Sequence, residues 1–422
     1  MISIELIRNN VEKVRKQLSL KGDISSIDNI VSLDESYRSH ISKSNELRSK
    51  RNKASEEIAL AKKLGNNADK EVQAMRQVGD EIKLIEQKAN KIKNELDSLL
   101  LVLPNLPHKS TPVGKDNTEN KLIREWGEDI NKDFELKNHL ELGNALSLFD
   151  FDAAAKISGS GFPLYKDNGA KLERALINYM LDHQTKNYGY REIFPPFLVR
   201  DKSPLTTGNL PKFSDDMYHI ENDDLWMIPT AEVPITNLHQ DEILSDDDLP
   251  LKYAAYSACF RREAGSHGKD TKGLLRLHQF NKVELVQFVK PESSYDALEE
   301  LTLHAESILQ SLGLKYRVME LCTGDLSFAA AKCYDLELWA PAERKWLEVS
   351  SCSNFESFQA RRGKIRYRKS KDGNVEFVHT LNGSGVATPR LLVSLIETYQ
   401  NSDGSISVPE PLQPYVGLEV IN

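Results

Sequence analysis

The sequence predicts an α+β fold in two parts: an antiparallel two-helix coiled-coil arm, then a core with a largely antiparallel β-sheet flanked by helices. Two observations lead to this prediction. In residues 1–103 the apolar side chains recur at alternating steps of three and four, which is typical of helices packed along a narrow seam. From about Leu122 onward, short strand-like runs are interspersed with a few helices in no strict βαβ order.

The arm is the first element that the pattern defines. One seam keeps the three-four spacing without a break and consists of Met75, Val78, Ile82, Ile85, Ala89, Ile92, Leu96 and Leu99. A looser seam of the same period lies upstream, and the turn-like residues Gly65–Asp69 separate the two. Helices of about 27–64 and 69–102 joined by so short a turn must run antiparallel. Each would extend roughly 50 Å at 1.5 Å per residue, which predicts a projecting arm.

A linker and then the core follow the arm. The segment 104–121 is rich in proline and polar residues and is predicted to be a linker. The core, residues 122–422, contains runs typical of strands, namely EIFPPFLV, DLWMIPT, KVELVQFV, LKYRVME and YDLELWA. Helices are expected at 170–187, 293–312 and 388–400.

Length and composition limit the class of protein. A chain of 422 residues with 40% hydrophobic and 28% charged residues is typical of a soluble protein of two or three domains. It has no apolar run long enough for a membrane span and no secretory signal, so we expect a cytoplasmic protein without a membrane partner. The four cysteines form no CxxC pair, which argues against a disulfide framework or a zinc cluster, and no zinc is expected.

Charge is unevenly distributed along the chain. The net charge of −8 argues against a protein that coats nucleic acid without specificity. Between Arg38 and Lys63, however, eight basic residues face only three acidic ones, a local charge of +5. Such a run is usually a solvated helix face, and a nucleic-acid contact is the alternative.

The familiar nucleotide-binding motifs are missing. The sequence contains no GxxxxGK[ST] loop, and its paired glycines lack the third glycine of a dinucleotide fingerprint. GxSxG and HExxH are absent as well. These absences disfavour the common nucleotide folds and leave phosphate chemistry of another kind open.

Two segments carry residues suited to phosphate and metal chemistry. The first, 260–285, joins two strand-like pieces through a glycine-rich basic loop that contains Lys269 and Lys272. The second places Glu348 ahead of hydroxyl groups up to Ser351, and such oxygen ligands suit a hard cation. Taken singly, each segment also has an ordinary structural interpretation, as a surface ion pair or an exposed strand end.

A third segment is a turn of small residues that leads into a helix. Thr388 is predicted to cap this helix, with Pro389 at its first position. Arg390 then lies in the first turn, where a cation opposes the helix dipole. This unfavourable placement indicates that Arg390 binds a ligand, and a solvent-facing arginine is the alternative.

In this order, the segments resemble the signature motifs of class II aminoacyl-tRNA synthetases. Segment 260–285 resembles the FR-x-E hairpin of motif 2, and 383–390 resembles the G-x-G-x-x-x-x-R turn of motif 3. Helix 170–187 with the stretch ending at Pro196 resembles motif 1, which builds the dimer interface in that class. The stretches IPTAE, FRREAGSHGKDTKGLLRLHQFNKVEL, EVSSCSNFESFQARR and LNGSGVA, together with the arm, are similar to the seryl-tRNA synthetase family, bacterial type. The resemblance covers essentially the whole chain.

This resemblance implies the activity and its partners. A member of the family activates L-serine with ATP to seryl-adenylate and pyrophosphate, then transfers serine to the 3′ end of tRNA(Ser). The family also charges tRNA(Sec) in organisms that have it, so tRNA(Sec) is a second expected partner. The resemblance further implies a homodimer and a tRNA-binding role for residues 1–103. The arm residues expected to contact tRNA are Lys43, Arg48, Lys50, Arg51 and Lys53.

The resemblance also assigns roles to individual residues. The implied ATP-binding residues are Arg261, Arg262, Glu263, Arg276, Phe280, Glu348, Val349, Ser350, Ser351 and Arg390. Among them Arg261, Glu263 and Arg390 form the implied catalytic set, and Glu348 and Ser351 are implied to ligate Mg²⁺. The implied serine-binding residues are Thr230, Ala231, Glu232, Glu284 and Ser384. Arg262 occupies the variable position of FR-x-E and would face away if the strand alternates.

The chemistry of adenylate formation agrees with these roles. A carboxylate attacks a phosphate, so two anions meet, and catalysis depends on positioning and charge neutralisation. Two other hypotheses remain at this point: a paralogue that loads a non-tRNA acceptor, and a noncatalytic coiled-coil RNA-binding protein. The arm counts against the first, and the presence of Arg261, Glu263, Glu348 and Arg390 counts against the second.

Overall fold

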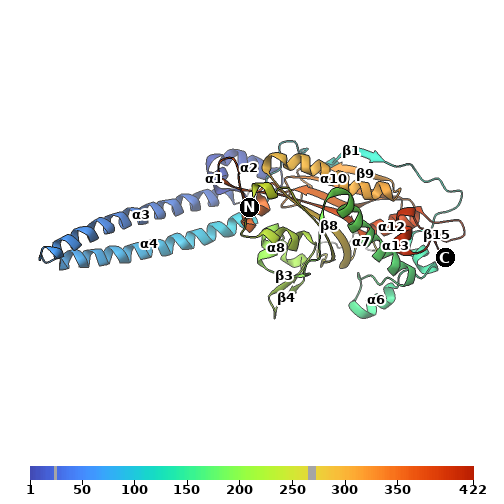
Figure 1. Cartoon of the computed structure of the whole chain (residues 1–422), viewed down its shortest axis with the longest axis horizontal. Helices are drawn as coiled ribbons and strands as arrows, with labels where there is room; N and C mark the ends of the chain where they lie inside the picture. Colours follow the sequence, from blue (N-terminus) through green and yellow to red (C-terminus); the bar gives the residue numbers. More distant parts are fainter. Residues whose placement is uncertain (23–25, 265–271) are drawn as a thin grey trace. The chain divides into compact units, whose positions relative to one another are not determined.

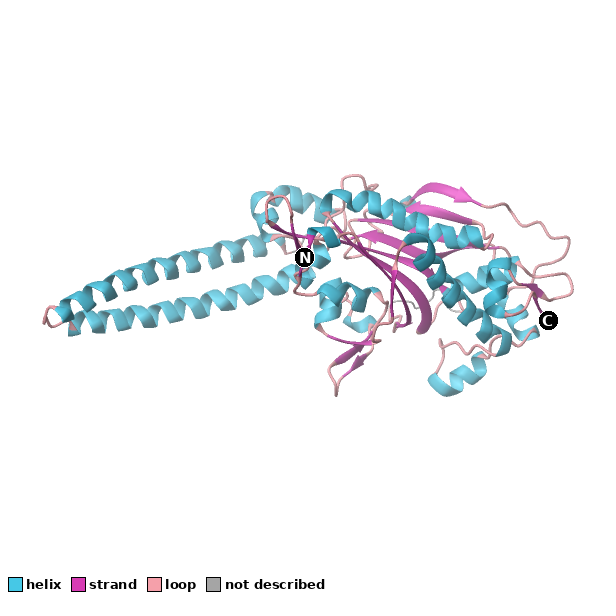
Figure 2. Ribbon diagram, in the orientation of Figure 1, coloured by secondary structure: helices cyan, strands magenta, loops and turns pink. Residues whose placement is uncertain are grey.

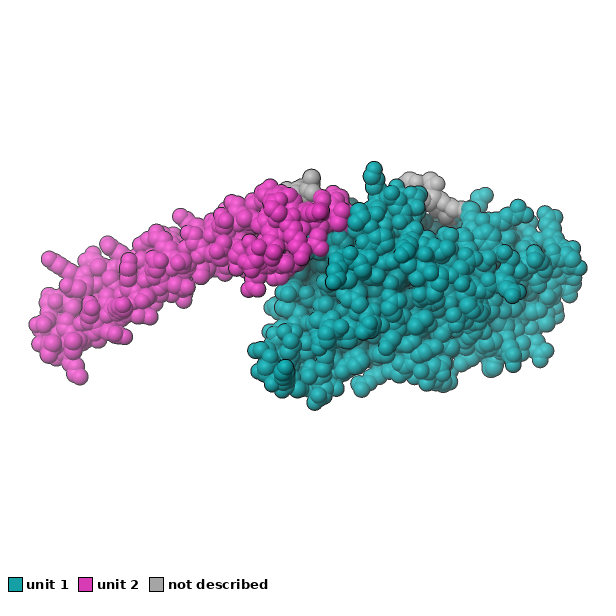
Figure 3. All heavy atoms as spheres, turned by 90° about the horizontal axis from the view of Figure 1, so that it is seen from above, with its two compact units in different colours: residues 1, 105–422 teal, residues 2–104 magenta. Residues whose placement is uncertain are grey.

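The structure is a computed structural model of the chain that describes residues 1–22, 26–264 and 272–422 (Figure 1). Contacts between residues divide it into two compact units, Ile2–Pro104 and Met1 with Asn105–Asn422, which Figure 3 colours separately. Within the described residues, no helix combines the length and apolarity that a bilayer span requires. We call Ile2–Pro104 the arm unit and the remainder the core unit.

The arm unit is a long antiparallel helical hairpin with two short helices before it (Figure 1). Its helices are α1 (Ile4–Asn9), α2 (Val11–Ser19), α3 (Ile27–Lys63) and α4 (Asp69–Val102). Gly65 adopts a left-handed conformation, with φ of +79°, in the turn that joins α3 to α4. The predicted coiled-coil hairpin is confirmed.

Burial in the hairpin follows the predicted seam. Ile82, Ile85 and Ala89 of α4 are buried, and they are the central members of the three-four repeat. A polar contact reinforces the pairing, because the Ser44 hydroxyl of α3 donates a hydrogen bond to Glu86 Oε1 of α4 over 2.9 Å. Two helices thus share one narrow apolar stripe, while their remaining faces stay in solvent.

The core unit is built on an eight-stranded sheet with the strand order β1-β9-β10-β11-β14-β8-β7-β2. In that order the strands are β1 (Lys121–Trp126), β9 (Tyr316–Glu320), β10 (Lys332–Ala340), β11 (Lys345–Asn354), β14 (His379–Ala387), β8 (Gln279–Val289), β7 (Leu251–Phe260) and β2 (Arg191–Ile193). All neighbouring pairs are antiparallel except β2 and β7, which are parallel. The predicted α+β class with a largely antiparallel sheet is confirmed.

Helices and small sheets surround this large sheet (Figure 2). The helices are α5 (His139–Ala145), α6 (Phe151–Ser158), α7 (Asp167–Tyr188), α8 (Lys202–Thr207), α9 (Glu232–Thr236), α10 (Ser294–Ser311), α11 (Phe358–Gly363), α12 (Thr388–Thr398) and α13 (Gln413–Val416). The smaller sheets contain β3 (Leu198–Arg200), β4 (His219–Ile220), β5 (Leu225–Met227), β6 (Ile243–Ser245), β12 (Arg366–Arg368), β13 (Val375–Phe377), β15 (Ile406–Ser407) and β16 (Val420–Ile421). The predicted helices 170–187, 293–312 and 388–400 correspond to α7, α10 and α12.

Strand alternation gives the large sheet one apolar and one polar face around β8 and β14. Leu285 of β8 is fully buried in the main core, and a Cβ added at Gly383 of β14 would meet Leu301 of α10 at 3.2 Å. The neighbouring residues Glu284 and Ser384, which pair across these strands, point to the opposite face. Core packing on one face therefore leaves the other face for polar groups.

The segment predicted as a linker is held along the core unit. Asn105 Nδ2 donates hydrogen bonds to the carbonyls of Ala329 and Phe355, and each donor–acceptor distance is 2.9 Å. Thr111 is buried, and its hydroxyl donates to the carbonyl of Ala331 over 3.0 Å. These bonds satisfy polar groups that would otherwise be orphaned, so the stretch after Pro104 is part of the core unit.

Candidate active site

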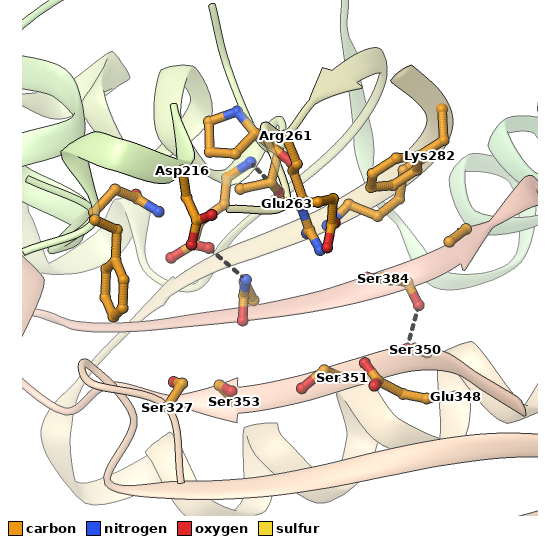
Figure 4. A pocket seen from close by; sticks show the side chains of 18 of the residues that line it. Asp216, Arg261, Glu263, Lys282, Ser327, Glu348, Ser350, Ser351, Ser353 and Ser384 are labelled. Atoms are coloured by element: carbon orange, nitrogen blue, oxygen red, sulfur yellow. Dashed lines mark hydrogen bonds between the residues drawn. The ribbon is translucent and has the colours of Figure 1, made fainter. Parts of the chain in front are cut away.

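The polar face of the sheet forms the floor of a pocket of about 570 Å³ in the core unit (Figure 4). This volume lies within the range of about 300–1,000 Å³ that is usual for small-molecule sites. The pocket brings together predicted residues from segments far apart in the sequence: Thr230, Glu232, Arg261, Glu263, Arg276, Phe280, Glu348, Val349, Ser350, Ser351, Ser384 and Arg390. Figure 4 shows Glu348 and Ser351 on one strand, across the pocket from Arg261 and Glu263.

One end of the pocket presents arginines beside an aromatic ring. The Arg261 guanidinium lies 5.0 Å from the centroid of the Phe280 ring. Its Nε donates to the carbonyl of Pro229 over 3.4 Å. Arg276 forms an ion pair with Glu263, so both side chains are held in place. A rigid guanidinium beside a flat apolar ring suits a phosphate joined to a planar base.

Arg390 reaches the same end from α12. Its Nε donates to the carbonyl of Leu275 over 3.1 Å, and its Nη1 donates to the carbonyl of Glu348 over 2.8 Å. The Glu348 carboxylate lies 3.8 Å away. Two backbone carbonyls thus hold a cation that sits unfavourably in the first turn of a helix, which leaves its charge available to an anion in the pocket.

The predicted cap of α12 is wrong in its detail. Ala387 is the N-cap, and Thr388 is the first helical residue. The Thr388 hydroxyl instead donates to the Glu173 carboxylate and to the carbonyl of Asn281, 3.1 Å away. The Thr388 hydroxyl therefore bonds the buried Glu173 carboxylate of α7 and does not cap the backbone at the start of α12.

A β-bulge sets the direction of the two predicted metal ligands. Glu348 and Ser351 are three residues apart, and a regular strand would place them on opposite faces. The register between β10 and β11 shifts at Leu336/Glu337, so that Glu337 opposes Glu348 while Asp335 opposes Ser351. Directly opposed side chains share a face, and the bulge thereby places both oxygen ligands toward the pocket.

The other end of the pocket is built from buried carboxylates. The Thr230 hydroxyl donates to Glu284 Oε2 over 2.9 Å, and Lys282 forms an ion pair with the same carboxylate. Glu232 accepts hydrogen bonds from Gln359 Nε2 and from Asn382 Nδ2, at distances of 2.5 Å and 2.8 Å. Burial, and then the charge of Glu284, raise the pKa of Glu232 to about 7.

Three predicted site residues do not line the pocket. Arg262 lies beyond the end of β7, exposes its side chain, and donates its backbone N–H to the carbonyl of Asp216 over 2.9 Å. Ala231 is fully buried in an apolar cluster with Ile235. Glu284 lies beneath the floor and reaches the pocket through Thr230. Lys272 is exposed, and Lys269 of the same loop lies outside the described residues.

Several pocket residues were not predicted from the sequence. Asn382 and Lys282 line the end of the pocket that holds the buried carboxylates, and Gln359 donates a hydrogen bond to Glu232. Asn382 lies two residues from the predicted Ser384, so strand alternation placed it on the same face. Gln359 comes from α11, and no local pattern connects it to the pocket.

The basic residues of the arm differ in their surroundings. Lys43 and Arg48 of α3 form ion pairs with Glu81 and Glu86 of α4, with distances of 3.2 Å and 2.6 Å. Lys50 and Lys53 lie further toward the tip with exposed side chains, and Arg51 between them is partly buried. The hairpin therefore neutralises the first part of the basic run internally.

Comparison with known proteins gives matches along the whole chain. Residues 1–107 match the family described as the seryl-tRNA synthetase N-terminal domain, and residues 213–399 match the class II core domain of tRNA synthetases (G, H, P, S and T). A serine–tRNA ligase of Geobacillus kaustophilus is 53% identical over 99% of each chain.

Two solved structures show the same fold over the full length. The crystal structure of seryl-tRNA synthetase from Pyrococcus horikoshii complexed with ATP has a TM-score of 0.94 and 38% identity, with 100% of this chain and 99% of that chain covered. The cytoplasmic serine–tRNA ligase of Naegleria fowleri in complex with AMP has a TM-score of 0.89 and 29% identity, with the same coverage.

Proposed function

The chain belongs to the seryl-tRNA synthetase family, and from this premise we propose that its pocket activates L-serine with ATP and then transfers serine to tRNA. The activity is ATP-dependent serine–tRNA ligation. The observation that carries the assignment of the site is the pairing of opposite charges in one pocket. Arginines line one end and buried carboxylates the other, which matches a substrate pair of polyphosphate and ammonium.

Adenylate formation requires the serine carboxylate to attack the α-phosphorus of ATP while pyrophosphate leaves. We assign Phe280 to the adenine face, because its ring lines the pocket beside Arg261. Arg261 is assigned to the α-phosphate, and Arg390 to the phosphates that depart. Fixed guanidinium groups neutralise the charge that develops on the phosphate oxygens without having to reorganise.

The residues at the bulge fit a magnesium ion. Glu348 offers a carboxylate and Ser351 a hydroxyl, and both point to the same face of the sheet at the phosphate end. Hard oxygen donors of this kind are what Mg²⁺ prefers, usually together with substrate phosphates. When bound, Mg²⁺ supplies charge neutralisation to the polyphosphate.

The serine end has the groups to recognise an amino acid with a hydroxymethyl side chain. The Glu232 carboxylate is assigned to the substrate ammonium, because it lines the pocket. Thr230 and Ser384 also line the pocket. Glu284 lies beneath them and is assigned to the recognition of the substrate hydroxyl, which it supports through its hydrogen bond with Thr230. A site built to hydrogen-bond a hydroxyl can reject the analogue that lacks it by roughly 10⁴-fold or more.

We assign tRNA binding to the arm unit, and specifically to the exposed part of its basic run. Among the residues that the structure describes, Lys50, Arg51 and Lys53 form no ion pair with α4 of the kind that Lys43 and Arg48 form. Replacing Lys50, Arg51 and Lys53 together by glutamine is expected to raise the KM for tRNA(Ser) at least tenfold, since each lost phosphate contact weakens binding. Replacing Lys43 and Arg48 by glutamine should raise the KM by less than half as much on a logarithmic scale, that is, by less than about threefold where the first change is tenfold. Equal effects would place the contact elsewhere on the arm.

A homodimer and a cytoplasmic location complete the proposal. The dimer is assigned to the face formed by α7 and β2, because these elements correspond to the segment that resembles motif 1, which builds the dimer interface in that class. Phe194, which follows β2, is 74% exposed. Sedimentation of the purified protein would give twice the chain mass if this assignment is right. We propose tRNA(Sec) as a second acceptor, and aminoacylation of the purified tRNA(Sec) with serine tests this.

The direct test of the function is ATP–pyrophosphate exchange with purified protein, Mg²⁺ and each amino acid in turn. Exchange is expected with serine alone. If serine exchange occurs but tRNA(Ser) is not charged, a non-tRNA acceptor becomes the better hypothesis. A folded protein without any exchange would contradict the assigned chemistry and leave RNA binding by the arm.

A further inference from the structure

The 3₁₀ turn η2 (Ser214–Asp216) brings to the pocket an acidic residue that takes no part in the assigned steps of adenylate formation. Asp216 lines the pocket and is partly buried, whereas its neighbour Asp215 is exposed and does not line the pocket. Figure 4 shows Asp216 on the same side of the pocket as Glu263, across from Ser351. Asp216 is therefore placed to act on the segment that follows β7.

Asp216 binds the chain on both sides of Glu263. Its backbone carbonyl accepts the N–H of Arg262, and its Oδ1 accepts the N–H of Ala264, each at a donor–acceptor distance of 2.9 Å. Both donors come after β7 has ended at Phe260. One residue from outside the large sheet thus holds two N–H groups of the segment that leaves it.

The residue between these two bonds has an unfavourable backbone. Glu263 has a φ of +52°, in the left-handed region, which is strained for a residue with a Cβ and persists only where the surroundings enforce it. In this conformation the Glu263 carboxylate forms an ion pair with Arg276, and both side chains line the pocket. The strain therefore lies where a pocket carboxylate is aimed, and the bonds from Asp216 enclose it.

The turn that carries Asp216 is itself held in place. Met217, which follows the turn, is 2% exposed. Phe213, which precedes the turn, packs edge-on against the ring of Phe328 with 6.1 Å between the centroids, and its N–H donates to the carbonyl of Asn209 over 2.8 Å. A residue can position another only when its own position is fixed, and these contacts meet that condition.

We propose that Asp216 is a positioning residue for the nucleotide, which fixes the backbone on both sides of Glu263 and thereby aims the Glu263 carboxylate into the ATP end of the pocket. This inference rests on the proposed function, because it presumes that Glu263 binds ATP. The bond from the Ala264 N–H is the part that depends on the side chain of Asp216, and it requires an oxygen acceptor, which an amide also supplies.

The test measures the KM for ATP and the KM for serine in pyrophosphate exchange. Asp216→Ala removes the acceptor of the Ala264 N–H and is expected to raise the KM for ATP about tenfold, the size of one lost hydrogen bond, while the KM for serine stays within about twofold. Asp216→Asn keeps an oxygen acceptor and should bring the KM for ATP back to within about threefold of wild type. Asp215→Ala removes the exposed neighbouring carboxylate and, as the matched control, should stay within about twofold. If Asp216→Ala matched either Asp216→Asn or Asp215→Ala, the proposal would be overturned.

A double-mutant cycle separates positioning from direct contact with ATP. It is measured by isothermal titration with α,β-methylene-ATP and Mg²⁺, which requires no turnover. If Asp216 acts through Glu263, Asp216→Ala should change the affinity by less than about twofold once Glu263→Ala has removed the carboxylate. Losses that simply multiply would show that Asp216 contributes independently of Glu263, against the proposal.

A further variant covers the case in which thermal unfolding shows that Asp216→Ala is not folded. Asp216→Glu keeps the charge and the acceptor but moves the oxygen by one methylene, so it should also raise the KM for ATP and leave the KM for serine unchanged. An unchanged KM for ATP in this variant would contradict the proposal.

The outcomes distinguish this inference from the function on which it rests. Wild-type protein that exchanges pyrophosphate with serine retains the proposed function, even if Asp216→Ala behaves like Asp215→Ala. Folded wild-type protein without exchange contradicts the proposed function itself.

Discussion

The two ends of the pocket hold charges of opposite sign, each largely through neutral partners. At the phosphate end, Arg390 is held by backbone carbonyls, and Arg261 by a carbonyl and an aromatic ring. Neither guanidinium is fully neutralised there. At the serine end, Glu232 is buried and is held by two neutral amides, from Gln359 and Asn382. Neutral partners thus position Arg261 and Glu232 and leave most of their charge for a substrate, whereas Arg390 also lies 3.8 Å from the Glu348 carboxylate. Such an arrangement favours recognition over stability.

The largest expected effect comes from removing a cation at the phosphate end. Arg261→Ala should lower kcat/KM in pyrophosphate exchange by about 10³-fold, roughly 4 kcal/mol, because a fixed donor to the transition state is lost. Arg262→Ala is the matched control, since Arg262 is the next residue in the chain and its side chain lies outside the pocket. We expect that control to stay within about twofold. Similar losses in the two variants would mean that the pocket does not bind the phosphates.

The next effect concerns the charge at the serine end. Glu232→Gln keeps the shape but removes the carboxylate, and it should raise the KM for serine by about 10²-fold, roughly 3 kcal/mol, with little change in the KM for ATP. The comparison of the two ends predicts this separation. A parallel rise of both constants would indicate that the variant damages the whole pocket.

Some features of the fold and of the pocket could be predicted from the sequence, and others depend on how the strands pair. Arg390 could be predicted because an arginine in the first turn of a helix is unfavourable without a ligand, and the hairpin because its seam repeats without a break. The common direction of Glu348 and Ser351 could not, since it depends on a bulge created by pairing with β10. Arg262 was included through its place in a motif, although strand alternation already predicted that it would face away, and in the structure it lies beyond the end of β7 and outside the pocket.

Selectivity for the substrate hydroxyl should change by a smaller amount. Thr230→Val removes the hydroxyl that donates to Glu284 and replaces it with a methyl group. The ratio of kcat/KM for serine over that for alanine is expected to fall about tenfold, because the carboxylate loses a partner that orders it. Competition exchange assays with both amino acids measure this ratio. An unchanged ratio would remove Thr230 from the recognition of the hydroxyl.

A change of the same size is expected in the dependence on pH. The pKa of Glu232 is raised to about 7, and the substrate ammonium requires the carboxylate, so the binding-competent form increases as the pH rises through 7. We expect kcat/KM for serine to rise about tenfold between pH 6 and pH 8, since this parameter reports groups of the free enzyme. Glu232→Gln should abolish the rise. A profile that is flat in the wild type, or that persists in the variant, would assign the titration to another group.

The two ends of the pocket act together on one joined ligand, seryl-adenylate. Isothermal titration with a seryl-sulfamoyl-adenosine, compared with the same sulfamoyl-adenosine without its serine, tests it most directly. The joined ligand is expected to bind at least 10³-fold more tightly, with Arg261→Ala weakening both ligands and Glu232→Gln weakening only the one that carries serine. Equal affinity of the two ligands for the wild-type protein would contradict the account.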